Sequence, residues 1–167
     1  MTNPFTNKGW DGAPRIGTWG RDLLGADYAG NLIARSWILG AVDRARKPGS
    51  QVPIPCIKLR GEFERGKNVA ALMALGGELY FDREEWHSAT PAAGGIVDLS
   101  LESDETVRRA ISGQTHCYTA CVFAIAAGTQ NKDWHAIDCA RVDIAAIDLQ
   151  RDQLWAEAWE FVTGSGD

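Results

Sequence analysis

Apolar residues recur along the chain with two spacings, one typical of helices and the other typical of buried strands. Helical spacing predicts a short helix over 18–24, with Thr18 as its N-cap, and a longer helix over 31–46. A third amphipathic helix is expected over 149–162. Five apolar residues of the longer helix are predicted to face inward: Leu32, Ile33, Trp37, Leu39 and Val42.

Short apolar runs predict strands over 52–59, 95–101, 118–127 and 136–144. The run over 95–101 and the apolar part of the first run are each suited to burial on both faces of a sheet, so we expect them to be neighbouring central strands. Strands that alternate with helices predict an α/β fold around a largely parallel sheet.

Two further helices are expected between these strands. One covers 69–75 and ends at Gly76 and Gly77, before a brief extended segment over 79–81. The other covers about 103–111, where acidic residues in its first turn complement the helix dipole.

Composition narrows the class of protein. A chain of 167 residues with 45% apolar content can bury one core, so a single domain over 1–167 is expected. The net charge of −5 argues against broad, non-specific binding to nucleic acid, which normally needs a basic face. The N-terminus carries no apolar leader and no run is long enough to cross a bilayer, which predicts a cytoplasmic protein without a membrane partner.

Four cysteines could form two disulfides, but free buried thiols are the preferred interpretation because a core of this size needs no covalent staples. A zinc site is the alternative, and it would combine cysteines with neighbouring histidines. No CxxC pair supports that alternative. The four cysteines are Cys56, Cys117, Cys121 and Cys139, and the zinc candidates are His116, Cys117, Cys121, His135 and Cys139.

The segment from Gly61 to Asn68 matches the phosphate-binding P-loop at every position except the last. It reads Gly-Glu-Phe-Glu-Arg-Gly-Lys-Asn, with Asn68 where a serine or threonine is usual. A P-loop surrounds phosphates with backbone N–H groups and a lysine, and its hydroxyl ligates Mg²⁺. The nucleotide-binding candidates are therefore Gly61, Gly66, Lys67 and Asn68, and a chance turn between strand and helix is the alternative.

Segments on both sides of this loop resemble a known family. The runs WDGAPRIGTW (10–19) and DLLGA (22–26), the helix SWILGAVDRARKPG (36–49) and the closing segment IDLQRDQLWAEA (147–158) are similar to the virulence-associated protein E family. These are P-loop ATPase domains of phages, plasmids and genomic islands. The resemblance covers about residues 9 to 162.

This resemblance implies a P-loop NTPase-like three-layer sandwich of the AAA+ or superfamily-three type. It would have a helical N-terminal segment (1–50), a P-loop core (51–146) and a closing helix (147–163). It also implies an oligomeric ATPase that acts in the replication of mobile elements.

Three departures from the family concern catalysis. Asn68 lacks the compact hydroxyl that suits the octahedral geometry of Mg²⁺. Asp98 stands at the position of the metal-associated acid and is a candidate Mg²⁺ ligand. The second acid is displaced by one residue, from Leu101 to Glu102, and such a shift turns a strand side chain to the other face. We therefore treat Asp98 and Glu102 as vestigial catalytic candidates.

Sensor and arginine positions also differ. The nearest match to the family's sensor asparagine is Asn131, which requires a small insertion, and 133–138 reads DWHAID where the family supplies an arginine pair. An arginine finger is worth about 10³ to 10⁵ in turnover for related reactions, so its loss is severe. His135 in this run is interpreted as a structural or surface residue, because neutral imidazole replaces arginine poorly.

Together these changes predict a degenerate pseudo-ATPase scaffold that binds a host or phage protein, with inhibition of a defence complex as one role. No cofactor is required on this interpretation, and ATP with Mg²⁺ would bind weakly. The alternative is an active oligomeric ATPase or helicase-like protein, in which a neighbouring copy supplies charge. Three tryptophans outside the predicted helices are candidate interface anchors: Trp10, Trp86 and Trp134.

Overall fold

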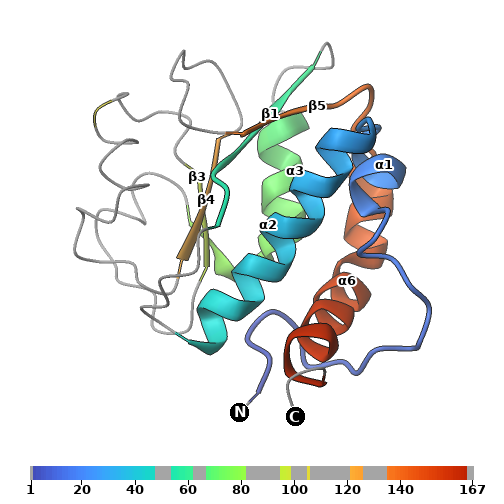
Figure 1. Ribbon diagram of the computed structural model, residues 1–167, viewed down its shortest axis with the longest axis vertical. Coiled ribbons are helices and arrows are strands. Elements are labelled where there is room, and N and C mark those ends of the chain that lie inside the picture. Colours follow the sequence, from blue (N-terminus) through green and yellow to red (C-terminus); the bar gives the residue numbers. More distant parts are fainter. Residues whose placement is uncertain are drawn as a thin grey trace.

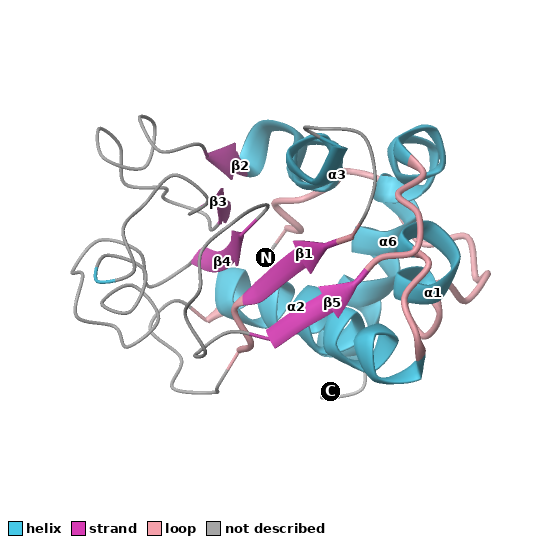
Figure 2. Cartoon of the chain, turned by 90° about the horizontal axis from the view of Figure 1, so that it is seen from above, coloured by secondary structure: helices cyan, strands magenta, loops and turns pink. Residues whose placement is uncertain are grey.

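A computed structural model describes residues 2–47, 54–61, 67–81, 95–98, 105, 121–125 and 135–164. Within these residues the fold is α/β, with helices packed on a five-stranded sheet of order β2-β3-β4-β1-β5. Figure 1 shows the sheet beside the long helices, and Figure 2 shows the strands from above.

The sheet is parallel throughout the described strands. Strand β1 (Ile57–Arg60) pairs with β4 (Cys121–Ile125) on one side and with β5 (His135–Asp138) on the other. Strand β3 (Gly95–Asp98) pairs with β4 and with the edge strand β2 (Tyr80–Phe81).

The prediction that the first strand and the run over 95–101 are neighbours is wrong, because β4 lies between β1 and β3. An apolar run indicates that a strand is buried on both faces, but it does not indicate which strand lies beside it.

One face of the sheet carries the main core. Residues paired in register across parallel strands point to the same side. Those facing the core are apolar: Ile57, Leu59, Ile96, Ala124 and Ile137. On the opposite face Val97 is also fully buried.

Two helices cover the core face. Helix α2 (Tyr28–Arg46) approaches β5 closely, and a Cβ added at Gly30 would lie 3.4 Å from Ile137. Helix α3 (Lys67–Gly76) covers β2 and β3, and a Cβ at Gly76 would lie 2.8 Å from the Tyr80 Cβ. Helix α6 (Ile144–Gly164) packs against both α2 and α3, on the side away from the sheet (Figure 1).

The first two helices begin with different caps. Helix α1 (Trp19–Leu24) agrees with the prediction, although the Thr18 side chain makes no capping hydrogen bond. Helix α2 begins at Tyr28, earlier than predicted, because the Asp27 carboxylate accepts a hydrogen bond from the Gly30 amide at 2.7 Å. Between them Gly25 adopts φ +65°, a conformation that favours glycine.

The inward face of α2 is only partly as predicted. Trp37 and Val42 are fully buried, but Leu32 is 44% exposed. The buried stripe runs through small residues, including Ala34 and Ala41, which let the helix lie close to its neighbours and turn Leu32 to the surface. Ile33 and Leu39 are half-buried.

Element boundaries differ most at the C-terminal end. The strand predicted over 136–144 ends at Asp138, and 139–143 is irregular. Helix α6 then begins at Ile144, before the predicted 149, and the Asp143 carboxylate accepts a hydrogen bond from the Ala146 amide at 3.1 Å. Val142 and Ile144 alternate with a polar residue as in a strand, but Val142 lies just before this helix and Ile144 begins it.

The other elements agree with their predictions more closely. Strand β1 begins at Ile57 rather than at 52, and α3 contains the predicted 69–75. Strands β2, β3 and β4 lie within their predicted runs. Of the helix predicted over 103–111, the described part of the chain contains Glu105, which is helical.

The N-terminal segment, defined as residues 3–16, is irregular and binds along α6. Phe5 stacks on Trp155 with ring centroids 4.0 Å apart. Farther along, the buried Glu157 carboxylate accepts hydrogen bonds from the backbone amides of Arg15 at 2.7 Å and Ile16 at 3.0 Å. A predicted helical region over 1–50 is therefore helical only from Trp19 onward.

No helix in the described ranges combines the length and the apolar character needed to cross a bilayer.

Candidate functional site

The carboxyl ends of the parallel strands form one edge of the sheet, which is where α/β proteins usually bind ligands. At this edge β1 ends at Arg60 and is followed by Gly61. Lys67 is the first residue of α3, so its side chain starts at the amino end of a ten-residue helix. Residues 62–66, including Gly66, lie outside the described part of the chain. Two of the four predicted nucleotide-binding residues, Gly61 and Lys67, thus flank the gap at the expected edge.

Asn68 connects this end of α3 to the sheet. Its side-chain amide Nδ2 donates a hydrogen bond to the Leu59 carbonyl oxygen at 3.3 Å. The carbonyl belongs to the penultimate residue of β1. The side chain at the position of the P-loop hydroxyl is therefore used to hold the first turn of the helix against the strand.

Asp98 ends β3 and is 6% exposed. The Tyr80 hydroxyl, which comes from β2, donates a hydrogen bond to Asp98 Oδ2 at 3.0 Å. Tyr80 pairs with Ile96, and Asp98 lies two residues farther along the same strand. Because alternate residues share a face, both Asp98 and Tyr80 point to the face that α3 covers.

Asp98, the predicted Mg²⁺ ligand, and Asn68, at the position of the P-loop hydroxyl, do not form a common site. Asp98 pairs with Ala124, which in turn pairs with Ile57, so Asp98 and Ile57 lie at the same level of the sheet. Asn68 is hydrogen-bonded to Leu59, two residues nearer the carboxyl ends of the strands. From the spacing of strands and of residues along them, the backbones of Asp98 and Leu59 are about 10 Å apart across the sheet and about 7 Å apart along the strands. Each side chain is also held by a partner within the protein, so this donor set does not fit Mg²⁺.

An ion pair that the sequence analysis missed lies beside Gly61. The Arg60 guanidinium binds the Asp138 carboxylate through two nitrogens, and the two residues are register partners on β1 and β5. The hydrogen bond from Arg60 lowers the pKa of Asp138 below its ordinary value and raises that of the arginine. Both side chains are more than half exposed, so the pair contributes little stability. Its sequence signal was only two opposite charges at the ends of two strands.

Several predicted residues lie elsewhere. His135 begins β5 and is exposed at the amino end of the strands, away from Lys67. Trp10 is 38% exposed, and its indole N–H donates to the Ala13 carbonyl at 2.9 Å. The remaining candidates fall outside the described residues: Glu102, Asn131, Trp86 and Trp134.

The two cysteines whose side chains are described, Cys56 and Cys139, are free and buried, as the sequence analysis expected of the thiols. Burial raises the pKa of Cys56 to about 12 and that of Cys139 to about 11, which keeps both protonated and unreactive at neutral pH. They adjoin opposite ends of β1, since Cys56 precedes it and the Cys139 amide donates to Arg60. No group of three metal-binding side chains occurs within the described ranges.

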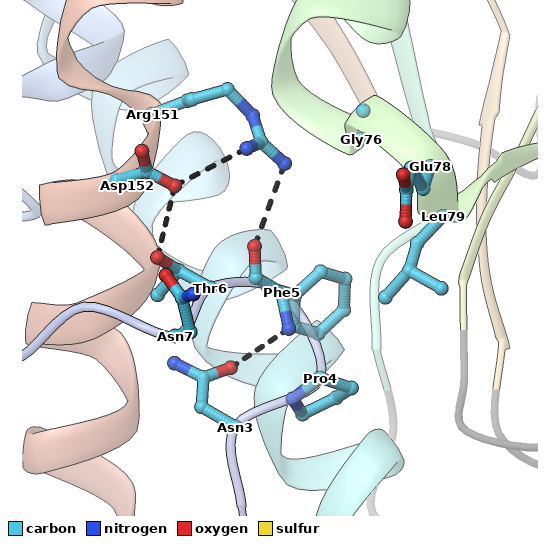
Figure 3. Close-up of a pocket in the computed structure, with 11 residues that line it drawn as sticks. Asn3, Pro4, Phe5, Thr6, Asn7, Gly76, Glu78, Leu79, Arg151 and Asp152 are labelled. Carbon is cyan, nitrogen blue, oxygen red and sulfur yellow. Dashed lines mark hydrogen bonds and ion pairs between the residues drawn. The ribbon is translucent and has the colours of Figure 1, made fainter.

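A pocket of about 430 Å³ lies at the other end of α3 (Figure 3). Its walls are the N-terminal segment, the turn after α3 and the first part of α6. Arg151 donates to Asp152 Oδ1 at 3.2 Å and to the Phe5 carbonyl at 3.5 Å, and the Thr6 hydroxyl donates to the same Asp152 oxygen at 2.9 Å. These polar groups hydrogen-bond to one another, so we interpret the pocket as a space between packed structural elements.

Neither the scan against models of protein families nor the search among curated proteins found a match to this chain. The resemblance to the virulence-associated protein E family therefore stays a prediction.

Proposed function

We propose that this chain is a degenerate P-loop ATPase-like domain of phage or mobile-element origin, and that it serves as a protein-binding or inhibitory scaffold. Its partner would be a host or phage protein. Hydrolysis of ATP would be absent or close to background.

The unit formed by β1 and α3 supports the P-loop part of this proposal. A parallel strand leads to Gly61, and the next described helix begins at Lys67. A helix N-terminus with a lysine favours anions. The strand before the loop and the strand that ends in Asp98 belong to one parallel sheet, with β4 between them.

The hydrogen bond between Asn68 and Leu59 is the observation that carries the loss of catalysis. The amide nitrogen of Asn68 donates to the Leu59 carbonyl of β1, so only the amide oxygen is left to face a cation, in place of the compact hydroxyl that suits Mg²⁺. The missing arginine pair in 133–138 removes a second part of the same mechanism. Because the parts of a catalytic site act as a unit, either loss is enough to reduce turnover severely.

The retained lysine favours the second candidate function, an oligomeric ATPase that is still active. Lys67 occupies the first position of α3, and Asp98 is kept at the end of β3. A neighbouring copy would have to supply the missing positive charge, as arginine fingers do in trans.

Turnover of Mg²⁺-ATP separates these two candidates. The scaffold proposal expects no hydrolysis above that of the Lys67→Ala variant, which serves as the matched background control. A rate of about 1 s⁻¹ or more that is lost in Lys67→Ala would make the active ATPase the better assignment.

Binding of a partner tests the scaffold role directly. Purification from a phage-infected host under native conditions, with and without ATP, should recover a stoichiometric protein partner in both cases. The Lys67→Ala variant should recover the same partner, because the scaffold does not need nucleotide. A partner that is recovered only with ATP and only by the wild type would contradict the proposal.

A further inference from the structure

The first residues of the N-terminal segment lie on α6 as a separate short peptide would. We call residues 3–8 the arm and residues 9–14 the linker. The arm has no regular secondary structure, and its buried Phe5 ring stacks on Trp155. Every residue of the linker is exposed, and a Cβ added at either of its glycines would meet nothing within 4 Å. The arm is therefore held by its own contacts and joined to the rest of the chain by a segment that packs little.

Polar contacts fix the position of the arm along α6. The Thr6 hydroxyl donates to Asp152 Oδ1 at 2.9 Å, and Lys8 Nζ lies 3.4 Å from the other oxygen of that carboxylate. The Asn3 side-chain amide donates to the Trp155 carbonyl oxygen at 3.1 Å. The arm thus binds through an aromatic ring, a hydroxyl next to it in sequence and a cation two residues later.

The arm does not fill the space in which it lies. It forms one wall of the pocket of about 430 Å³, and Glu78 and Leu79 lie on the opposite wall (Figure 3). Pockets of this volume are large enough to bind ligands. A segment with larger side chains than those of the arm therefore has room between α6 and the turn after α3.

We propose that the surface of α6 under the arm is a peptide-binding site, which the arm occupies in cis. Its partner is an extended segment of another protein with the same pattern of an aromatic, a hydroxyl and a basic residue. This inference rests on the proposed scaffold function, to which it assigns a class of partner. Departure of the arm would open the fully buried Trp155 ring on the side where Phe5 stacks. Aromatic side chains of this kind are frequent anchors of interfaces.

The linker makes the arm an effective competitor for the site. A short flexible linker gives a tethered ligand an effective concentration of about 1 mM. If the arm alone binds with a dissociation constant of about 10–100 µM, its occupancy in cis weakens the binding of an equivalent free peptide about ten- to a hundredfold. The site is thus closed to weak ligands and open to a segment that binds more tightly than the arm.

A fluorescein-labelled synthetic peptide with the sequence of residues 2–8 tests the proposal on the full chain. Phe5→Ala weakens the arm and leaves α6 unchanged. In fluorescence anisotropy the peptide should therefore bind at least about tenfold more tightly to Phe5→Ala than to the wild type. Phe161→Ala is the matched control, because Phe161 is 47% exposed near the C-terminal end of α6. This control should bind the peptide as the wild type does.

The gain must also depend on the surface of α6. Adding Asp152→Ala to Phe5→Ala removes the acceptor for the hydroxyl and ammonium groups of the peptide. It should weaken peptide binding at least about tenfold, because hydrogen bonds to charged groups are among the stronger ones. A peptide with alanine in place of its phenylalanine should bind no variant measurably.

Circular dichroism establishes first that each variant is folded. If Phe5→Ala is not, Asn3→Ala combined with Thr6→Ala weakens the arm without removing its ring and should also bind the peptide more tightly than the wild type. A folded variant with a weakened arm that binds the peptide no more tightly than the wild type overturns the proposal. Failure of both variants to fold also overturns it, because the arm would then be an integral part of the core.

These outcomes are separable from those of the proposed function. Hydrolysis of ATP by the wild type would remove the scaffold assignment without changing the affinity for the peptide. Absence of peptide binding would remove this site and leave the scaffold to act through another surface.

Discussion

The two ends of helix α3 are held in very different ways. At the amino end, Asn68 in the first turn donates a hydrogen bond to Leu59, nine residues away in the chain. At the carboxyl end, Trp155 donates to the Leu75 carbonyl at 2.7 Å, and Arg151 Nε donates to the Ala74 carbonyl at 3.0 Å. Both donors come from α6, about 80 residues later.

This difference separates stability from the candidate site. The negative end of the α3 dipole lies at the carboxyl end of the helix. The Arg151 guanidinium beside it is therefore electrostatically favourable as well as hydrogen-bonded. Large buried side chains contribute most of the packing energy at this end. The amino end carries residues of the proposed phosphate site, and the described residues of its first turn, 67–70, are only half-buried. Substitutions there can abolish chemistry while the fold persists, as expected for a degenerate enzyme that remains a scaffold.

The largest effect should come from the carboxyl end. Trp155 is fully buried, stacks on Phe5 and makes the hydrogen bond to Leu75. Replacing it with alanine should lower the free energy of unfolding by about 3–5 kcal/mol in urea titrations. Trp10→Ala is the control and should cost less than about 1 kcal/mol, because Trp10 is 38% exposed. Equal losses in the two variants would contradict the comparison.

Substitution of a glycine at the same end should have the next largest effect on stability. Gly77 has φ +55°, and an added Cβ would lie 2.6 Å from Arg151 Nη2. Gly77→Ala should therefore cost about 1–2 kcal/mol in the same titration. Gly17→Ala is the matched control, because a Cβ at Gly17 meets nothing within 4 Å. A Gly77→Ala variant as stable as this control would show that the turn after α3 tolerates a side chain, and would contradict the comparison.

Substitutions at the amino end of α3 should lower the stability less. Asn68→Ala removes the hydrogen bond to Leu59 and should cost about 0.5–1.5 kcal/mol. Asn68→Asp keeps the size but replaces the donor with an acceptor, so it should be at least as destabilising. Chemical denaturation of the two variants beside Trp155→Ala gives the measurement. A loss for Asn68→Ala as large as for Trp155→Ala would mean that the two ends contribute equally.

Acid should produce the smallest effect, at an ion pair outside helix α3. The hydrogen bond from Arg15 lowers the pKa of Asp11 from 3.8 to about 2. A lowered pKa means that the stabilisation is present above the unfolded value and is lost as the pH falls from about 4 to about 2. Asp11→Asn should make the urea midpoint slightly less dependent on pH in this window. An unchanged dependence would show that this exposed ion pair contributes nothing measurable.

Periodicity was a good guide to the existence of the elements and a poor guide to their arrangement. Helices near 18–24 and 31–46 and the turn after Gly76 follow from local spacing and breakers. Leu32 fits the same spacing, yet it is exposed because small residues such as Ala34 define the buried stripe. Which residues of a helix face inward depends on the surface that it meets, and strand order depends on connections that no single run encodes.

The candidate site was predictable only where a motif names its residues. Gly61 and Lys67 lie at the expected edge of the sheet, since Gly61 follows β1 and Lys67 begins α3. Asp98 ends β3 as the run over 95–101 indicates, but it lies level with Ile57 and not at that edge. The hydrogen bond from Tyr80 to Asp98 could not be predicted, because it depends on the pairing of β2 with β3. The direction of the Asn68 amide likewise depends on the distance between α3 and β1.

The binding of the N-terminal segment along α6 has a consequence for the order of folding on the ribosome. Contacts such as that of Phe5 with Trp155 and that of Ile16 with Glu157 join residues that are synthesised more than 140 positions apart. Such distant contacts form late, after the chain between them has been made. The N-terminal segment must therefore wait, without these partners, until helix α6 emerges.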